Sequence, residues 1–427
     1  MRHLYSLILY LLTPLALLRL AWRGLRAPDY WRRWPERFGF FPAPARGGAI
    51  WVHAVSVGEF QAALPLIKAL MARYPAAPVV VTTTTPTGSA RVKAALGDAV
   101  FHVYAPYDLP GAVSRFLDRI RPQVAVIMET ELWPNLFHGC GRRGIPVILA
   151  NARLSERSAA GYRRIAGLTR QTLGCLAAIA AQSEADAQRL ISLGADAARV
   201  RVTGNIKFDI AIPVGLHEHA AALRHDLGAT RPVWIAASTH EGEDEVILEA
   251  HTLVRQRLPG ALLVLAPRHP ERFARVAQLA RKQGYGVVLR SDRRPCDHTT
   301  AVFIGDSMGE LMLFYAAADT AFVGGSLVPT GGHNMLEPAA LGLPVITGPH
   351  TFNFAQVGQM LIDAGAARQV NNARELAEVV IDDLHDADLR QSIGEKGRQI
   401  VAQNKGALRG LVEIIASWVK YDQSSKG

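Results

Sequence analysis

The stretch from Gly324 to Gly348, GGSLVPTGGHNMLEPAALGLPVITG, decides the fold of this chain. An apolar run, Thr320–Val323, comes directly before it, and a second apolar run, Val345–Thr347, closes it. Between the two runs lie a short glycine-containing loop and the predicted start of a helix at His333-Asn334. Strand, glycine loop, helix and strand together form a unit with which α/β proteins hold phosphate-bearing groups.

The residue types in this stretch point to a nucleotide. Glu337 follows Asn334 at i, i+3 spacing, which places both on one face of the predicted helix. A carboxylate there can accept hydrogen bonds from both hydroxyls of a ribose, while the glycines let backbone N–H groups approach a ligand. The pattern predicts a nucleotide or nucleotide-sugar site. The alternative is a tight turn and a capped helix without a ligand, because turns also use glycine.

Outward from this unit, apolar runs alternate with helical patterns, and most of the runs are continuous, as in parallel strands buried on both faces. The pattern weakens over residues 209–231, so we place a domain junction there. The predicted fold is α/β, with two doubly wound Rossmann-like domains facing each other across a cleft. The runs are residues 49–55, 78–83, 100–104, 124–128, 147–150, 179–181 and 200–202, then 233–237, 262–266, 287–289, 302–304, 320–323, 345–347 and 367–370.

Composition limits the class of partner. The 427 residues exceed one ordinary core, and their net charge of +10 predicts an anionic partner. No zinc-finger, RNA-recognition or helix-turn-helix pattern supports nucleic acid, so none is expected. The scattered cysteines form no CxxC, which argues against a disulfide framework and a zinc site. They are Cys140, Cys175 and Cys296.

The N-terminus predicts a membrane anchor in residues 1–20. Residues 4–18 are nearly all apolar, and arginines mixed with aromatic residues follow them. No small-residue cleavage site is evident, so an uncleaved anchor is favoured over a signal peptide. Because the arginines follow the run, the positive-inside rule places the remaining chain in the cytoplasm, at the inner membrane. The run either spans the bilayer or lies in its surface; an ordinary buried helix is the alternative.

The motif HAVSVGE, His53 to Glu59, follows the first strand-like run. Gly58 is a poor choice in a first helical turn unless something must approach closely. Glu59 would then point into the cleft as a general base for an incoming hydroxyl. The alternative is a capping box, in which Glu59 bonds the backbone N–H of Ser56.

Three later motifs of the first half offer acceptor contacts. METELWPN supplies Glu129 and Glu131, which could bind sugar hydroxyls or amines, unless they only mark a helix start. NARLSERS supplies Arg153, which could hold a phosphate or form part of a solvated basic face. TGNIKFD supplies Lys207, which we expect to face the cleft and help hold the donor.

Two motifs of the second half offer donor contacts. PRHPERF presents Arg268 and His269 between prolines, suited to a phosphate or a base edge. GDSMGELMLFY places Met308, Gly309 and Glu310 in a predicted first helical turn, where backbone groups could read a base. Helix capping or packing is the alternative for both. No metal constellation is evident, and no metal or other cofactor is expected.

Taken together and in this order, these motifs resemble the 3-deoxy-D-manno-octulosonic acid (Kdo) transferases of lipopolysaccharide biosynthesis, over nearly the whole chain. The resemblance implies a GT-B fold, with an acceptor domain at residues 21–212 and a donor domain at 213–427 whose last helices can cross back. It implies CMP-Kdo as donor and the lipid A precursor lipid IVA as acceptor, with inversion and without a metal. The implied base is Glu59, and the implied CMP contacts are Arg268, His269, Met308, Gly309, Glu310, Asn334, Met335, Leu336 and Glu337.

Three other functions compete with this one. The nearest is another GT-B lipid glycosyltransferase that uses a UDP-sugar. An NAD-dependent oxidoreductase would need G-x-G-x-x-G after a first strand, which HAVSVGE does not supply. A membrane-attached binding module without chemistry would use Glu59 only as a cap.

Overall fold

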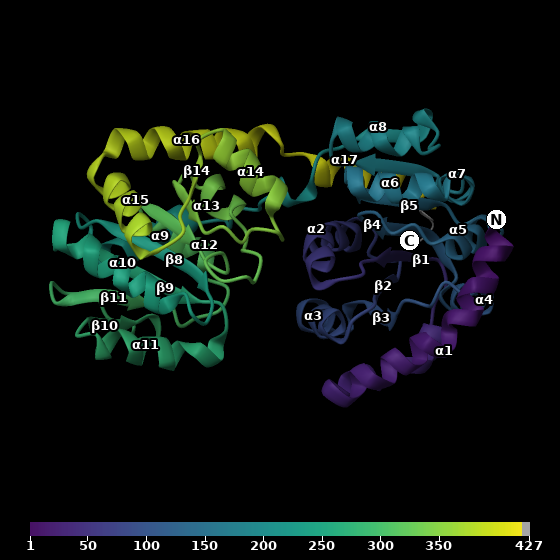
Figure 1. The fold of residues 1–427 in the computed structure, drawn as a ribbon, viewed down its shortest axis with the longest axis horizontal. Helices are drawn as coiled ribbons and strands as arrows, with labels where there is room; N and C mark the ends of the chain where they lie inside the picture. Colours follow the sequence, from purple (N-terminus) through teal and green to yellow (C-terminus); the bar gives the residue numbers. More distant parts are fainter. Residues whose placement is uncertain (421–427) are drawn as a thin grey trace, which may run out of the picture. The chain divides into compact units, whose positions relative to one another are not determined.

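The computed structural model describes residues 1–420, in which the chain forms two compact units (Figure 1). The first unit contains residues 1–209 and the chain from Lys405 onward, and the second runs from Ile210 to Asn404. Each unit is built on a seven-stranded parallel sheet within the described residues. Every apolar run named from the sequence coincides with a strand, give or take two residues at its ends.

The sheet of the first unit has the order β3-β2-β1-β4-β5-β6-β7. β1 pairs with β2 on one side and with β4 on the other, so the winding direction reverses between β1 and β4. The carboxyl ends of these two strands form a topological switch point, where open α/β sheets bind ligands. The strands are β1 (Ala49–His53), β2 (Val79–Thr83), β3 (Phe101–Tyr104), β4 (Pro122–Met128), β5 (Val147–Ala152), β6 (Ala178–Ala181) and β7 (Val200–Val202).

Helices cover both faces of this sheet because successive strand residues point to opposite sides. Trp51 of β1 belongs to a core with Phe116 and Phe137, whereas Ile50 packs with Phe60 on the other face. The helices are α2 (Val57–Arg73), α3 (Pro86–Leu96), α4 (Pro110–Ile120), α5 (Pro134–Gly141), α6 (Glu156–Arg164), α7 (Ala166–Leu173) and α8 (Glu184–Ser192).

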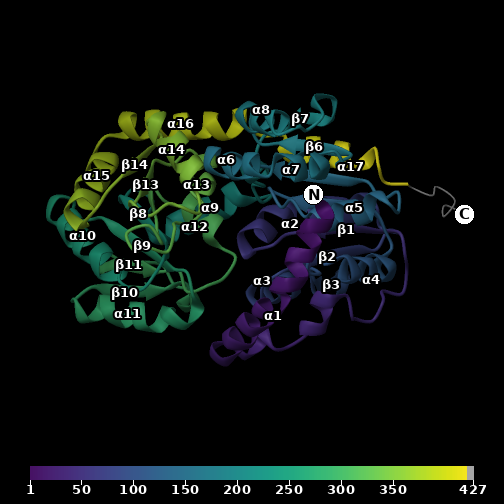
Figure 2. The same ribbon diagram turned by 45° about the vertical axis from the view of Figure 1, so that its right-hand side comes forward.

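A long N-terminal helix, α1 (Arg2–Arg26), lies along the outside of the first unit and begins beside α5 (Figures 1 and 2). The helix continues through Pro14. Its mean hydropathy reaches 1.8, and its length is enough to cross a membrane. Two short 3-10 helices, η1 (Pro28–Tyr30) and η2 (Trp34–Phe38), follow it.

The sheet of the second unit has the order β10-β11-β9-β8-β12-β13-β14, and its winding direction reverses between β8 and β12. Its strands are β8 (Val233–Thr239), β9 (Leu262–Pro267), β10 (Gly286–Leu289), β11 (Thr300–Ile304), β12 (Thr320–Val323), β13 (Val345–Thr347) and β14 (Ala367–Gln369). Its helices are α9 (Leu216–Gly228), α10 (Asp244–Arg257), α11 (Phe273–Lys282), α12 (Leu311–Ala316), α13 (Leu336–Ala340), α14 (Ala355–Asp363), α15 (Ala373–His385) and α16 (Ala387–Gln403).

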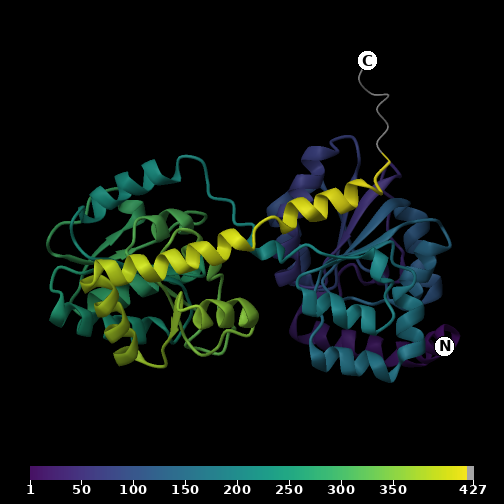
Figure 3. The same ribbon diagram turned by 90° about the horizontal axis from the view of Figure 1, so that it is seen from above.

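The chain returns to the first unit after α16, and its last helix, α17 (Ala407–Ala416), packs there (Figure 3). Leu411 and Ile415 of α17 are fully buried in the same core as Val52. The carboxylate of Asp209 accepts hydrogen bonds from the N–H groups of Gly406 and Leu408, both at 2.7 Å, and so caps α17. The second unit ends at Asn404, and Asp209 ties the start of α17 to the end of the first stretch of the first unit.

Candidate functional site

Glu59 lies in the first turn of α2, directly after β1, at the switch point of the first sheet. Its Oε2 accepts a hydrogen bond from the Val55 N–H at 2.8 Å, and its Oε1 accepts one from the Ser56 hydroxyl at 3.0 Å. The Glu59 N–H in turn donates to Oγ of Ser56 at 3.2 Å. The capping arrangement predicted as the alternative therefore forms, although the carboxylate bonds the N–H of Val55 instead of that of Ser56.

Burial gives this carboxyl an unusual proton affinity. Removal from water, together with the negative charges of Glu129 and Glu131, raises the pKa of Glu59 to about 7, against the hydrogen bonds from Val55 and Ser56, which lower it. A carboxylate with a pKa near the working pH is a suitable general base. The capping role and the catalytic role are therefore compatible in one side chain.

The two acidic side chains of METELWPN lie near Glu59, after β4. Glu129 has a left-handed backbone (φ 55°), a conformation that is rare and costly for a residue with a side chain. Glu131 accepts a hydrogen bond from Nε1 of Trp133 at 2.8 Å, and burial raises its pKa. The Trp133 ring stands edge-on against the buried His53 of β1, with centroids 5.2 Å apart. Packing between β1 and the loop after β4 thus orients the carboxylate of Glu131.

Lys207 belongs to this same group of residues. It lies in η5 (Ile206–Phe208) of the first unit, and its charge interacts with Glu129 and Glu59, while burial lowers its pKa. The structure therefore places Lys207 beside the predicted base and acceptor residues, and in a different unit from the other predicted donor residues.

Asn151 positions η5, and no motif argument singled it out. Its Oδ1 accepts the Ile206 N–H at 3.0 Å, and its backbone is left-handed (φ 54°). Asn151 is fully buried, and its Nδ2 has no hydrogen-bond partner among the described residues. Asparagine tolerates a left-handed backbone well, and its side chain can accept a hydrogen bond from a backbone N–H. A single asparagine in one sequence is too weak a signal to predict this role.

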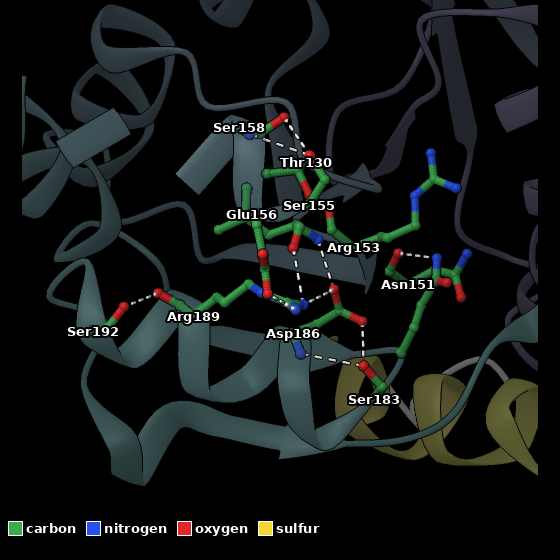
Figure 4. A network of polar contacts seen from close by, with 12 residues as sticks. Thr130, Asn151, Arg153, Ser155, Glu156, Ser158, Ser183, Asp186, Arg189 and Ser192 are labelled. Atoms are coloured by element: carbon green, nitrogen blue, oxygen red, sulfur yellow. Dashed lines mark hydrogen bonds and ion pairs between the residues drawn. The ribbon is translucent and has the colours of Figure 1, made fainter. Parts of the chain in front are cut away.

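Arg153 follows β5 on a loop held by polar contacts from two sides (Figure 4). Thr130 donates its hydroxyl proton to the Arg153 carbonyl, and the buried Asp186 of α8 accepts the Leu154 N–H at 2.8 Å. The Arg153 side chain is exposed and points away from this network in Figure 4. The loop thus presents a guanidinium on a fixed backbone, a suitable arrangement for an anionic group.

In the second unit, a carboxylate fills the glycine loop. Glu243, completely buried, accepts hydrogen bonds from the N–H groups of Gly325, Ser326 and Leu327 at 2.7, 2.9 and 2.9 Å. The Gly325 N–H, which was expected to be open to a ligand, is therefore bonded to Glu243 instead. Gly324 is required for another reason, because a Cβ there would lie 2.8 Å from the Ser238 carbonyl oxygen.

The helix after the glycine loop also starts later than predicted. α13 begins at Leu336, and Asn334 precedes it, accepting the Leu336 N–H at 3.1 Å and donating to Glu337 Oε1 at 3.0 Å. Asn334 and Glu337 are thus joined directly and do not share a helix face. α13 contains only five residues.

Charged and aromatic groups gather around Glu337. Burial raises the pKa of Glu337, and the positive charge of Arg268 opposes this effect. His333 Nε2 lies 2.8 Å from His240 Nε2, and the His240 ring stands edge-on to His269. The structure thus brings Arg268, His269 and the Asn334–Glu337 pair together. His240 was not predicted, although it comes from a strand-ending motif, STHEGEDE.

The remaining predicted donor residues differ in accessibility. Met308 is 60% exposed and Gly309 has a left-handed backbone (φ 87°), so this turn is open to a ligand. Glu310 pairs with Arg290 at 2.8 Å, and the two line a cavity of about 510 Å³. The side chains of Met335 and Leu336 are buried, so these two residues could offer a ligand only backbone groups.

Comparison with known proteins decides the family. The family profile described as 3-Deoxy-D-manno-octulosonic-acid transferase (kdotransferase) matches residues 32–210, and that of Glycosyl transferases group 1 matches residues 236–400. A 3-deoxy-D-manno-octulosonic acid transferase of Haemophilus influenzae is 42% identical over 424 residues, covering 98% of this chain and 99% of the relative. The chain belongs to the Kdo transferase family. It is a glycosyltransferase of lipopolysaccharide biosynthesis.

Further comparisons agree. A Kdo transferase of Bordetella pertussis is 39% identical over 439 residues, covering 98% of this chain and 99% of the relative. A UDP-GlcNAc 2-epimerase of Neisseria meningitidis, bound to UDP-GlcNAc, is similar in fold alone. Its TM-score is 0.55 at 14% identity, with 86% of this chain and 100% of that one covered. Two parallel-sheet α/β domains of this kind define the GT-B fold of this Kdo transferase, as predicted.

Proposed function

We propose that this Kdo transferase takes Kdo from CMP-Kdo and attaches it to a hydroxyl of lipid IVA, the tetraacyl disaccharide bisphosphate precursor of lipid A. The observation that carries the proposal is the Glu59 carboxylate, whose pKa is raised to about 7 at the switch point of the first sheet. Family membership supplies the sugar, and the charged groups around Glu59 and Glu337 supply suitable contacts for the two substrates.

The chemistry follows from one base and one anionic leaving group. Glu59 takes the proton of the acceptor hydroxyl while the acceptor oxygen bonds the anomeric carbon of Kdo. The bond from that carbon to the CMP phosphate breaks, and CMP leaves with the electron pair. A single displacement of this kind inverts the anomeric centre. In this proposal Arg268 stabilises the charge that develops on the phosphate, and no metal takes part.

The other predicted residues have these proposed roles. Arg268, His269, Asn334 and Glu337 hold CMP-Kdo, with the turn of Met308, Gly309 and Glu310 against the base. Met335 and Leu336 act through backbone groups, since their side chains are buried. For the acceptor, Glu129, Glu131 and Arg153 bind sugar and phosphate groups. Lys207, next to Glu129 and Glu59, contacts the Kdo or the phosphate of the donor.

We also propose that the enzyme works on the cytoplasmic side of the inner membrane. The apolar helix α1 would attach it to the bilayer, and the net charge of +10 would favour the anionic leaflet. From the cytoplasmic surface of this membrane, the enzyme would reach a bisphosphorylated lipid acceptor.

A transfer assay tests the proposal. Purified protein is incubated with lipid IVA and CMP-Kdo in the presence of a chelator, and mass spectrometry reads the lipid. A mass gain of one or more Kdo units is the expected result, and it would establish donor, acceptor and independence from added metal together. No gain from a folded protein that binds CMP would reject this acceptor. Competition by UDP but not by CMP would instead favour a UDP-sugar donor.

A further inference from the structure

The start of α1 is hydrogen-bonded to the first unit. The buried hydroxyl of Ser6 donates to Oδ1 of Asn135 at 3.0 Å, and Arg2 donates to the same oxygen at 3.2 Å. Asn135 is itself fixed, because its N–H and its side-chain amide donate to Asp108, at 3.0 and 2.7 Å. Tyr5 also hydrogen-bonds the Asp108 side chain. The first two turns of α1 thus sit on a buried polar platform.

The end of α1 returns to the same unit. The Trp31 indole N–H donates to the Ala21 carbonyl at 3.1 Å, which folds the chain back along the helix. Arg33 then bonds Glu36 and the His102 carbonyl, the latter at 2.9 Å. The buried Arg37 donates to the Thr84 carbonyl at 2.8 Å. The start of α1 and the segment that follows its end are therefore both attached to one folded unit.

The two faces of α1 differ in exposure. The less exposed positions recur every three or four residues, as on one side of a helix: Arg2, Ser6, Leu9, Thr13, Leu17, Leu20 and Gly24. The opposite side exposes apolar residues at the same spacing, each between 54% and 70% exposed: Leu4, Leu7, Leu11, Leu15, Leu18 and Trp22. A helix that spans a bilayer must instead place its ends on opposite sides of roughly 30 Å of hydrocarbon.

We propose that α1 lies in the plane of the membrane surface, with its exposed apolar side in the acyl layer and its start bound to Asn135. This inference rests on the membrane attachment proposed above and specifies its form. Asn135 ends the motif METELWPN, which also contains Glu131. In this proposal the contact between Ser6 and Asn135 holds the whole motif at the level of the lipid headgroups. The cationic side chains of Arg2 and Arg142 line a cavity of about 380 Å³ beside the helix start, which suits anionic headgroups.

Chemical labelling distinguishes the two orientations. In a background with the native cysteines replaced by alanine, single cysteines are introduced as His3→Cys, Leu11→Cys and Arg281→Cys. A membrane-impermeant maleimide is applied to spheroplasts and to inverted inner-membrane vesicles. We expect His3→Cys to react only in inverted vesicles, as the Arg281→Cys control in the second unit does, and Leu11→Cys to react in neither. Reaction of His3→Cys only in spheroplasts would show a spanning helix and overturn the proposal.

The same experiment separates this inference from the membrane attachment itself. If Leu11→Cys reacts in inverted vesicles, or the protein floats free of vesicles, α1 is not in the bilayer and both proposals fail. If His3→Cys reacts only from the other side, attachment stands and the in-plane orientation alone is rejected.

A matched pair of variants tests the contact with Asn135. Ser6→Ala removes the hydroxyl that contacts Asn135 of α5 and the Arg2 carbonyl within α1, whereas Thr13→Ala removes only a bond within α1, to the Leu9 carbonyl at 2.8 Å. We expect Ser6→Ala to slow transfer to lipid IVA in vesicles by a few fold, without changing transfer to detergent-dispersed lipid IVA or CMP binding. Thr13→Ala should change none of these. Equal rates for both variants in vesicles would contradict the positioning role.

Discussion

The Ser56 hydroxyl donates a hydrogen bond to the Glu59 carboxylate at 3.0 Å and accepts one from the Glu59 N–H at 3.2 Å. This exchange begins α2 and fixes the carboxylate at the end of β1. The second carboxylate oxygen is held by the Val55 N–H. A general base held in one orientation needs little reorganisation when the proton moves.

Ser56→Ala should therefore damage both stability and catalysis. Loss of an N-cap costs about 1 kcal/mol. The pKa of Glu59 should rise further, because the Ser56 hydroxyl lowers it in the native protein. Urea unfolding and the pH dependence of transfer would measure the two effects. Ser155→Ala is the control, since Ser155 caps α6 in the same way, away from Glu59. A Ser56→Ala enzyme with native kinetics would contradict the role of this hydrogen bond.

The activity should have an acidic limb set by Glu59. The carboxyl must be deprotonated to act as a base, so kcat/KM should rise as the pH increases through about 7 and level off above it. Glu129→Gln removes a neighbouring negative charge that raises the pKa of Glu59, so the limb should move to lower pH. Rates would be measured from about pH 5 to about pH 9 with subsaturating lipid acceptor, so that kcat/KM is obtained on both sides of the pKa of Glu59. An unmoved limb would show that another group controls it.

Glu129→Gly should separate stability from activity. The left-handed backbone at Glu129 costs a residue with a side chain about 1 kcal/mol or more, and glycine adopts it freely. The glycine variant should therefore unfold at a higher urea concentration than Glu129→Ala, while both lose most transfer activity. If Glu129→Ala proved the more stable of the two, the backbone would not be strained.

Glu243→Gln should disable the glycine loop of the second unit. Oε2 of Glu243 accepts the N–H groups of Gly325 and His240, at 2.7 and 2.8 Å. If the oxygen of the glutamine side chain takes the place of Oε1, its NH2 group takes the place of Oε2 and cannot accept hydrogen bonds from Gly325 and His240. Leaving two buried donors unpaired costs roughly 2–4 kcal/mol. We expect weaker CMP binding in calorimetry and a lower unfolding midpoint, and Glu241→Gln, at an exposed site, is the control. Unchanged CMP binding would show that the loop does not shape the donor site.

Much of this molecule could be predicted because its signals are local. The strands are short apolar runs buried on both faces, and Glu59 and Arg268 each lie shortly after such a run. Residues that act through distant contacts could not be found in this way. Glu243 bonds a loop about 80 residues further along the chain, and Asn135 bonds the start of α1. Composition and spacing do not show which residues far apart in the chain, such as Glu243 and Ser326 or Ser6 and Asn135, form hydrogen bonds with each other.

The start of α13 shows a second limit. Asn334 fits either inside a helix or just before it, since its side chain can bond a backbone N–H two residues on. The structure adopts the second arrangement, in which Asn334 donates a hydrogen bond to Glu337. Lys207 shows a third limit of prediction from sequence. Its motif lies close to the domain junction, and only the tertiary structure shows that its neighbours are Glu129 and Glu59.

The most direct test of the account is the rate of Kdo transfer by Glu59→Gln at a single turnover, with CMP binding and thermal unfolding measured on the same preparation. Glutamine retains the size of the side chain and cannot accept the proton. We predict a loss of transfer of at least a hundredfold, as expected for a general base, with CMP affinity unchanged and the protein still folded. Transfer at the rate of the native enzyme would contradict the assignment of Glu59 as the base.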